Sequence, residues 1–237
     1  MKKRSAIVVG ATGLVGQALT QQLCEDDNYV DVTIIVRTAP QYRHPKLTIK
    51  VRDFERIEAR DIDFAHEVFC CLGTTRKAAG SKVAFERVDF TYPLLIASLA
   101  KKKGIPHFLV ISAMGANEAS RFYYSRVKGK VEKALIAMDF DQLSIIRPSL
   151  LRGERAKFRL GEKSGAALLK VMKPLLQGPL RKYQAIEGVQ VAQAMRCIAL
   201  YQPVQKVKVY TSQELQNIEP PLQDEDDKKT FDWSKRG

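Results

Sequence analysis

Short apolar runs alternate with segments of helical spacing along most of the chain. Short segments rich in apolar and β-branched residues predict strands at residues 6–9, 30–36, 47–51, 67–72, 107–112, 143–147 and 207–210. Apolar positions three and four residues apart predict helices at residues 14–24, 83–103, 125–138 and 188–200. Such alternation is typical of an α/β fold, in which helices cover both faces of a doubly wound parallel sheet.

Three segments between these elements carry local signals. Residues 55–59 follow Asp53 and are expected to form a short helix. Residues 78–81 are small and predict a loop, while Pro93 predicts a kink within the long helix at 83–103.

Glycines at positions 10, 13 and 16 separate the first predicted strand from the first predicted helix. Gly10 permits a tight turn, Gly16 allows close packing of helix and strand, and Gly13 lets the backbone approach a pyrophosphate at the helix N-terminus. The spacing G-x-x-G-x-x-G differs from the G-x-G-x-x-G of the standard dinucleotide fingerprint. It is the spacing used by short-chain dehydrogenases/reductases, so it predicts a Rossmann-type, nucleotide-binding sheet.

The 237 residues, 45% of them apolar, suffice for one core. We expect a single NAD(P)-binding Rossmann domain over residues 1–215, whose part from 151 to 215 forms a small C-terminal extension on the substrate side. Residues 216–237 are expected to form a charged C-terminal tail. No apolar stretch approaches the length of a membrane span. The three histidines lie far apart in the sequence, so no metal site is predicted.

The chain is strongly basic, with a formal net charge of +13. Ten basic residues against two acidic ones fall between positions 147 and 182. Such a segment can meet nucleic acid, an anionic membrane surface or an acidic substrate, or it can be a solvated surface that aids capture of an anionic cofactor. No nucleic-acid motif accompanies it, so a nucleic-acid partner is not favoured.

The four cysteines lack C-x-x-C spacing, and Cys70 and Cys71 point to opposite faces of a predicted strand. This pattern is typical of buried thiols in a reducing compartment. The basic start of the chain could begin a secretory signal, but the glycines in phase with a strand and a helix argue against it. We therefore expect a cytoplasmic protein.

The end of the second predicted strand carries Arg37 and no acidic residue. An acid there would bind the ribose hydroxyls of NAD, whereas a guanidinium can pair with the 2′-phosphate of NADP. We therefore predict NADP, with NAD less favoured and an ordinary surface arginine as the alternative. Asp53 can flank the adenine or cap the short helix. Gly73 and Thr74 follow the fourth strand, beside the point where the strand order reverses, and are expected to line the cofactor.

Tyr124 and Lys128 lie four residues apart on one predicted helix, and Ser112 ends the strand before it. A carbonyl that accepts hydride develops negative charge on its oxygen, which must be stabilised and protonated. Tyr124 can act as general acid/base, with its pKa lowered by the ammonium of Lys128. Lys128 can also hold the nicotinamide ribose, and Ser112 can orient the carbonyl. Tyr-x-x-x-Lys alone is a weak motif, and its combination with Ser112 and the glycine turn is specific.

Residues 5–210 resemble an atypical member of the short-chain dehydrogenase/reductase superfamily. More narrowly, GATGLVG, CCLGTTRKAAG, FERVDF and FYYSRVKGKVE are similar to the Tat-interacting oxidoreductase family. The resemblance implies a Rossmann fold, bound NADPH and a Ser-Tyr-Lys triad. It implies cofactor contacts, besides Tyr124 and Lys128, at Gly10, Thr12, Gly13, Leu14, Val15, Arg37, Gly73 and Thr74, with Pro148 and Leu150 near the nicotinamide. The helix-borne Asn that completes the proton relay of many short-chain dehydrogenases has no clear counterpart.

The sequence thus predicts an NADP-dependent oxidoreductase of the short-chain type, which transfers hydride between the nicotinamide and a small carbonyl or alcohol, an anionic one included. The alternative is a non-catalytic, NADP-binding redox sensor that acts through protein partners. The triad-bearing helix pairs between subunits in many short-chain dehydrogenases, so a homodimer is kept open as one oligomeric state, which the sequence alone does not decide.

Overall fold

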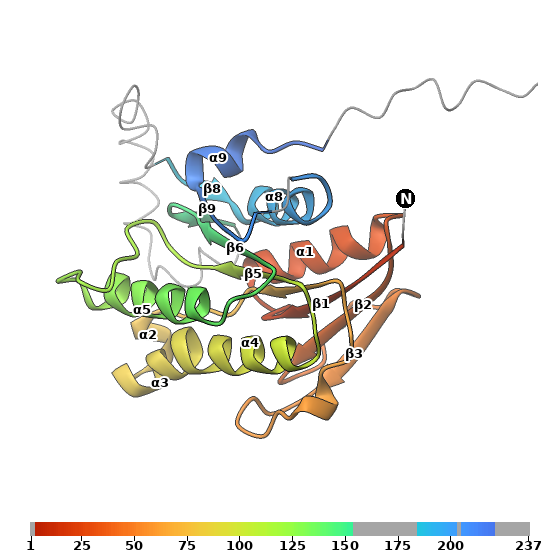
Figure 1. Cartoon of the computed structure of the whole chain (residues 1–237), viewed down its shortest axis with the longest axis horizontal. Helices are drawn as coiled ribbons and strands as arrows, with labels where there is room; N and C mark the ends of the chain where they lie inside the picture. The colour runs from red at the N-terminus through yellow and green to blue at the C-terminus, as the bar shows by residue number, and fades with distance from the viewer. Residues whose placement is uncertain (1–2, 154–183, 203–204, 221–237) are drawn as a thin grey trace, which may run out of the picture.

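Seven parallel strands form the central sheet in the computed structural model, which describes residues 3–153, 184–202 and 205–220. Their order is β3-β2-β1-β4-β5-β6-β9 (Figure 1). The strands are β1 (Arg4–Val9), β2 (Tyr29–Val36), β3 (Leu47–Val51), β4 (Glu67–Cys70), β5 (His107–Ile111), β6 (Gln142–Arg147) and β9 (Val207–Thr211). The order reverses between β1 and β4, which confirms the predicted Rossmann-type sheet.

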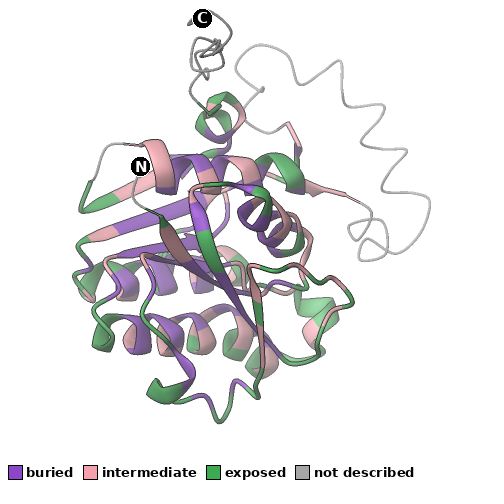
Figure 2. Cartoon of the chain, turned by 90° about the vertical axis from the view of Figure 1, so that its right-hand side faces the viewer, coloured by how far each residue is buried: buried purple, intermediate pink, exposed green. Residues whose placement is uncertain are grey.

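Helices cover both faces of this sheet (Figure 1). One face packs on α1 (Leu14–Glu25) and α8 (Gly188–Tyr201), and the other on α4 (Tyr92–Lys102) and α5 (Tyr123–Ala137). Strand β1 serves both cores, because Ala6 and Val8 point to the first and Ile7 and Val9 to the second. Figure 2 shows burial through the central strands and along the helix faces that pack on them.

Cys70 and Cys71 contact opposite cores, as their alternation predicts. Burial raises the pKa of both thiols, that of Cys70 to about 12, so both are protonated at neutral pH.

The long helix predicted at 83–103 is divided into three parts. These are α3 (Lys82–Glu86), a π-helical turn η2 (Arg87–Thr91) and α4, whose first turn contains Pro93. The Tyr92 N–H donates to the Arg87 carbonyl, five residues back. Because Pro93 has no N–H, it cannot extend the α-helical bonding toward Asp89. The predicted kink is therefore a local change in helical register just before the proline.

Two short segments differ from their predictions. The short helix predicted at 55–59 does not form, because residues 55–58 are not helical, and a 3₁₀ turn η1 occupies Ala59–Asp61. The Asp53 carboxylate accepts a hydrogen bond from the Glu55 N–H at 3.0 Å, which makes a tight turn in place of a helix cap. Part of the loop predicted at 78–81 is helical, because Thr75 caps α2 (Arg76–Ala79) and Gly80 ends it with a φ of +80°.

The C-terminal part adds a second, small sheet and a last helix. Strands β7 (Leu151–Arg152) and β8 (Ile186–Glu187) pair in parallel, and α9 (Ser212–Asn217), which the sequence analysis did not predict, follows β9. Residues 154–183, with most of the basic segment predicted at 147–182, lie outside the described residues, as does the tail from 221 onward. Within the described ranges, no helix is both long and apolar enough to cross a membrane.

Candidate functional site

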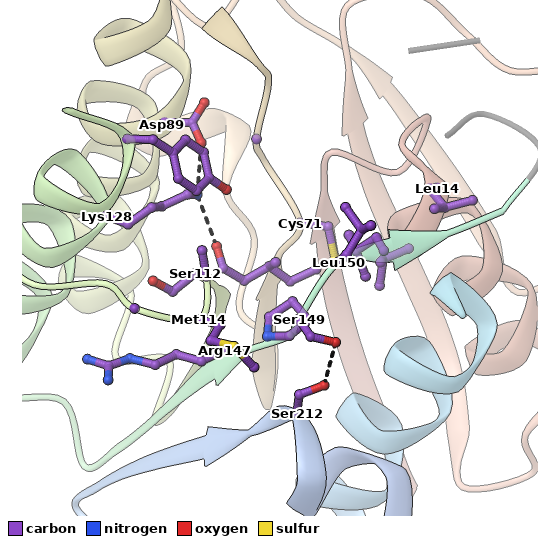
Figure 3. A pocket seen from close by; sticks show the side chains of 18 of the residues that line it. Leu14, Cys71, Asp89, Ser112, Met114, Lys128, Arg147, Ser149, Leu150 and Ser212 are labelled. Atoms are coloured by element: carbon purple, nitrogen blue, oxygen red, sulfur yellow. Dashed lines mark hydrogen bonds and ion pairs between the residues drawn. The ribbon is translucent and has the colours of Figure 1, made fainter. Parts of the chain in front are cut away.

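A cleft of about 980 Å³ opens at the carboxyl ends of β1, β4, β5, β6 and β9 (Figure 3). Its lining includes ten of the residues predicted for catalysis or cofactor binding: Gly13, Leu14, Val15, Gly73, Thr74, Ser112, Tyr124, Lys128, Pro148 and Leu150. The loops after β5 and β6 lie side by side there, because the Met114 N–H donates to the Pro148 carbonyl at 3.0 Å. The cleft therefore lies where ligands bind in doubly wound sheets.

The glycine turn has the close contacts that its sequence predicts. Gly10 has a φ of +79°, and a Cβ there would lie 2.5 Å from the Cys71 carbonyl oxygen. A Cβ at Gly16 would lie 2.3 Å from the Gly10 carbonyl oxygen. Side chains at these two positions would push β1 away from the segment after β4, or α1 away from the turn. Gly10 thus shapes the cleft without lining it.

The N-terminus of α1 borders the cleft through Gly13, Leu14 and Val15. Gly13 is the N-cap and provides no capping side chain, and the first turn contains no acidic residue. The orphan N–H groups of this turn, together with the helix dipole, suit an anionic group such as a pyrophosphate. The residues present therefore fit a dinucleotide at this edge of the sheet.

Lys128 forms a buried ion pair that the sequence analysis did not predict. Its Nζ lies 2.8 Å from Oδ1 of Asp89, and the two side chains are 3% and 0% exposed. Oδ2 of Asp89 accepts a hydrogen bond from the Thr74 N–H at 2.9 Å, and Lys128 also donates to the Ile111 carbonyl at 3.3 Å (Figure 3). Asp89 thereby ties η2, the loop after β4 and α5 together around one charge.

Burial lowers the pKa of Lys128, but the charge of Asp89, followed by Tyr124, outweighs it and holds that pKa above its ordinary value. Asp89 belongs to the π-helical turn η2, a feature that is frequent at functional sites.

Tyr124 lies at the mouth of the cleft with 43% of its surface exposed, and its ring packs on Phe85 with 5.7 Å between centroids. Burial raises the pKa of Tyr124, and the nearby charge of Lys128, which acts in the other direction, does not offset it. The charge of Asp89 adds to the increase. Lys128 thus acts in the direction that the sequence predicts, but burial of Tyr124 outweighs it and the net shift of this pKa is upward.

Ser112 is buried, and its hydroxyl donates to Oε1 of Glu132 on α5. Arg147, at the end of β6, holds the same carboxylate, with its Nε 3.0 Å from Oε1 and its NH2 nitrogen donating to Oε2. The hydrogen bond to Glu132 raises the pKa of Arg147, more than burial lowers it. The two lysine and arginine cations that line the described part of the cleft, Lys128 and Arg147, are thus each paired with a carboxylate.

Four predicted cofactor residues do not line this cleft: Gly10, Thr12, Arg37 and Asp53. Arg37 is exposed and directly follows β2, at the edge of the sheet where the cleft opens. Asp53 is exposed and bonds to its own turn. Their assigned roles remain predictions, since a bound dinucleotide extends beyond one pocket.

The fold also brings to the site polar residues to which no sequence motif had given a role. Asp89 and Glu132 are acidic residues on otherwise apolar helix faces. A buried carboxylate needs a cationic or hydrogen-bonding partner, so their positions in the sequence were a signal that each pairs with another polar group. Ser149 and Ser212 share a 2.9 Å hydrogen bond at the floor of the cleft, and only the pairing of β6 with β9 brings them together (Figure 3). Among the described residues, no group of three His, Cys, Asp or Glu could hold a metal ion.

Known proteins are similar to this chain in sequence or in fold. The rat protein HTATIP2 is 38% identical over 167 residues, which cover 68% of this chain and 69% of that protein. The mitochondrial protein FMP52-1 of Scheffersomyces stipitis is 36% identical over 156 residues, covering 64% of this chain and 69% of that protein. The human epimerase family protein SDR39U1, solved with NADPH, shares the fold, with a TM-score of 0.56, 16% identity and coverage of 87% of this chain and 74% of that chain.

These matches confirm the resemblance inferred from the motifs. They contradict the predicted cytoplasmic location, because several yeast relatives are named mitochondrial. A family model described as NAD(P)H-binding matches residues 10–168, which include the glycine turn, Ser112, Tyr124 and Lys128. The chain therefore belongs to the NAD(P)H-binding family.

Proposed function

We propose that the protein is an NADP-dependent oxidoreductase that transfers hydride between the nicotinamide and a small carbonyl or alcohol. One observation carries the proposal: a single cleft is lined by the anion-binding N-terminus of α1 and by Ser112, Tyr124 and Lys128. The first feature suits a dinucleotide, and the second suits proton transfer to a reacting oxygen.

The chain's own residues would hold the cofactor along the edge of the sheet. The backbone at Gly13, Leu14 and Val15 would bind the pyrophosphate, and Arg37 would pair with the 2′-phosphate of NADP. Gly73 and Thr74 would pass beneath the cofactor, and Lys128 would donate to the nicotinamide ribose. Pro148 and Leu150 would pack against the nicotinamide, which supplies or accepts the hydride when bound.

Tyr124 would donate a proton to the reacting oxygen during reduction and accept one during oxidation. Its raised pKa keeps the phenol protonated at neutral pH, which favours reduction of a carbonyl. The 43% exposure of Tyr124 leaves it accessible to a substrate. Lys128, held by Asp89, would act mainly as a hydrogen-bond donor, because its charge is balanced.

Among the residues that the structure describes, the lining of the cleft supports a neutral carbonyl substrate rather than an anionic one. Leu150, Leu151 and Met114 line it, and Lys128 and Arg147 are already paired. If the chain forms a homodimer, the triad-bearing helix α5 would pair with the same helix of a second copy.

Binding of NADPH and NADH, followed separately by nicotinamide fluorescence, tests the cofactor assignment. We expect NADPH to bind more tightly, and Arg37→Ala to remove most of that preference. Lys102→Ala is the control, because it deletes an exposed charge at the C-terminus of α4. Equal affinity of the wild type for both cofactors would refute the role of Arg37, and binding of neither would refute the proposed function.

Turnover with a panel of aldehydes and ketones tests the chemistry. We expect Tyr124→Phe to lower kcat by about 10²- to 10⁴-fold and to leave NADPH binding intact. Tyr123→Phe is a matched control, because the neighbouring hydroxyl donates to the Lys82 carbonyl at 3.2 Å and does not line the cleft. Equal activity of the two variants would refute the assignment of Tyr124, and NADPH binding without any turnover would favour a redox sensor.

A further inference from the structure

The Ser112 hydroxyl has a defined hydrogen-bond direction. Its partner is Oε1 of Glu132, and a carboxylate oxygen has no proton to give, so Ser112 is the donor. Ser112 and Glu132 are 3% and 4% exposed, so water does not compete for this bond. A serine hydroxyl has one proton and two lone pairs. With the proton directed at Glu132, Ser112 presents only lone pairs to the cleft that it lines (Figure 3).

Arg147 keeps Glu132 in the position that this bond requires. It donates from Nε and from a terminal nitrogen to the two carboxylate oxygens, a two-point contact that fixes the carboxylate plane. The Ser112 N–H also donates to the Ile146 carbonyl at 2.7 Å, which fixes the serine backbone to β6, the strand that carries Arg147. Ser112 directly follows β5, Glu132 belongs to α5 and Arg147 ends β6, so hydrogen bonds join three neighbouring parts of the fold at this point.

We propose that Glu132 is a positioning residue for the reaction, which turns Ser112 into a hydrogen-bond acceptor at the reacting centre. The inference rests on the proposed function and changes the role that the sequence assigned to Ser112. A carbonyl oxygen needs a donor, so Ser112 in this state does not polarise the carbonyl. It accepts a hydrogen bond from an O–H group, either that of Tyr124 or that of an alcohol substrate.

The proton steps follow from this polarity. During reduction, the O–H bond of Tyr124 would break as the new O–H bond forms on the substrate oxygen, and the hydride for the carbonyl carbon would come from NADPH when it is bound. Ser112 keeps its own O–H bond throughout. During oxidation, Ser112 aligns the substrate hydroxyl, whose proton goes to the Tyr124 phenolate. Tyr124 is thus the sole proton donor to the oxygen.

A double-mutant cycle in kcat and KM tests whether Glu132 acts through Ser112. We expect Ser112→Ala and Glu132→Gln each to lower kcat by about tenfold to a hundredfold, with a smaller effect on KM. In the Ser112→Ala background, Glu132→Gln should lower kcat by less than about a further threefold, because the hydroxyl through which Glu132 acts is gone. A further tenfold loss there would overturn the proposal.

Glu118→Gln is the matched control, because Glu118 forms an exposed ion pair with Lys133 and does not line the cleft. We expect it to keep the wild-type kcat, and NADPH binding should persist in every variant of the cycle. A loss of kcat in Glu118→Gln as large as that in Glu132→Gln would show that any charge change in this region matters, and it would overturn the proposal.

A second measurement needs neither turnover nor a change at Glu132. The Ser112 hydroxyl proton, held on a buried carboxylate, should give a slowly exchanging, downfield ¹H NMR signal in the wild type that is absent from Ser112→Ala. Absence of this signal from the wild type would overturn the proposal even where the enzyme is active. A wild type that shows the signal but reduces no carbonyl would refute the proposed function and leave the hydroxyl direction supported.

Discussion

Replacing Asp89 by Asn should destabilise the protein much more than loss of an ordinary ion pair. Asp89 and Lys128 are 0% and 3% exposed and lie 2.8 Å apart, so the substitution leaves a buried ammonium without its counter-charge. Removing one partner of a buried pair costs about 3–5 kcal/mol. For a chain of this size, a loss of that magnitude lowers Tm by roughly 6–20 °C.

The pH dependence of this loss has a definite sign. The pKa of Lys128 is raised in the folded state, because the charges of Asp89 and Tyr124 outweigh burial. The stabilisation from Lys128 is therefore fully present below the unfolded pKa of about 10.4 and is lost as pH rises through the folded value. The difference between wild type and Asp89→Asn should be largest near neutral pH and should shrink above about pH 10.

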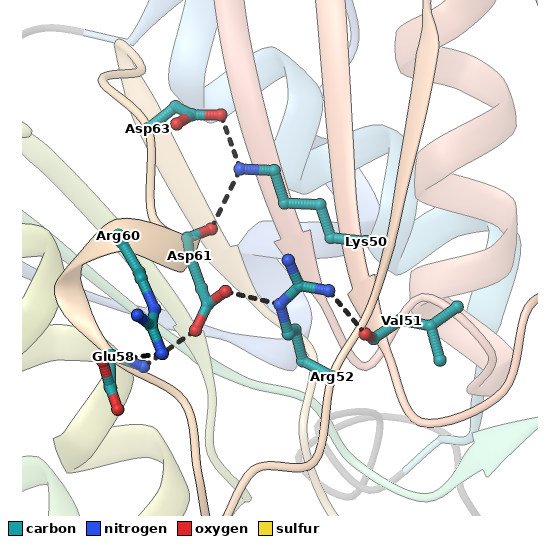
Figure 4. A network of polar contacts seen from close by, with 7 residues as sticks. All are labelled: Lys50, Val51, Arg52, Glu58, Arg60, Asp61 and Asp63. Atoms are coloured by element: carbon teal, nitrogen blue, oxygen red, sulfur yellow. Dashed lines mark hydrogen bonds and ion pairs between the residues drawn. The ribbon is translucent and has the colours of Figure 1, made fainter.

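Urea unfolding at pH 7, followed by circular dichroism, measures the cost. Asp63→Asn is the control, because Asp63 is 65% exposed and pairs with Lys50 at the surface, 2.6 Å away (Figure 4). That variant should lose about 0–1 kcal/mol. Combining Asp89→Asn with Lys128→Met should recover part of the stability, because no buried charge remains unpaired. A cost for Asp89→Asn equal to that of Asp63→Asn would refute the reasoning.

Three further predictions concern pH and packing. Burial, assisted by the charge of Arg4, lowers the pKa of His107 to about 3. Stability should therefore be full above pH 6.5 and fall toward pH 3, by at most about 1.4 kcal/mol per pH unit, and urea titrations of His107→Asn should lack this contribution. Gly16→Ala should cost about 1–3 kcal/mol in urea unfolding, because its Cβ would lie 2.3 Å from a carbonyl oxygen, and more than Gly13→Ala, whose nearest contact is 3.1 Å; equal costs would contradict this. The raised pKa of Tyr124 predicts carbonyl reduction that is level from pH 7 to 9 and alcohol oxidation that rises over that range, and oxidation that levels off below pH 8 would contradict it.

Local signals in the sequence were sufficient to predict the strands and the glycine turn. The seven strands were predicted within two residues. The five inner strands are runs dominated by apolar residues because the sheet is covered on both faces, and the partly buried edge strands β3 and β9 keep apolar residues at alternate positions. The glycine turn was also predictable from local sequence. A Cβ at Gly16 would collide with the Gly10 carbonyl oxygen, and Gly10 has a positive φ, so one strand–turn–helix unit already requires both glycines. Ser112 and Lys128 were found in the same way, because their spacing follows from one strand end and one helix face.

Local signals did not predict two features: the change from α-helical to π-helical hydrogen bonding at η2, and the turn that replaces a short helix after Asp53. The π-helical turn η2 arose between two α-helical segments that the apolar spacing joined into one. The stretch after Asp53 turned because its carboxylate bonds the Glu55 N–H. Both outcomes depend on single hydrogen bonds of about 1 kcal/mol, which periodicity does not record.

Neighbours along the chain are enough to specify the α/β pattern, the glycine turn and the helix face on which Tyr124 and Lys128 lie. The chemistry of that face depends on contacts between segments that are far apart in the sequence. Asp89 reaches Lys128 from a different helical segment. Burial of Tyr124, to which the charge of Asp89 adds, outweighs Lys128 and raises the pKa of Tyr124. Glu132 takes the hydrogen bond that the Ser112 hydroxyl donates, so the proton of that hydroxyl is not directed into the cleft. Hydrogen-bond direction and charge balance act through space, and the residues that set them are 15 to 39 positions from their targets in the sequence.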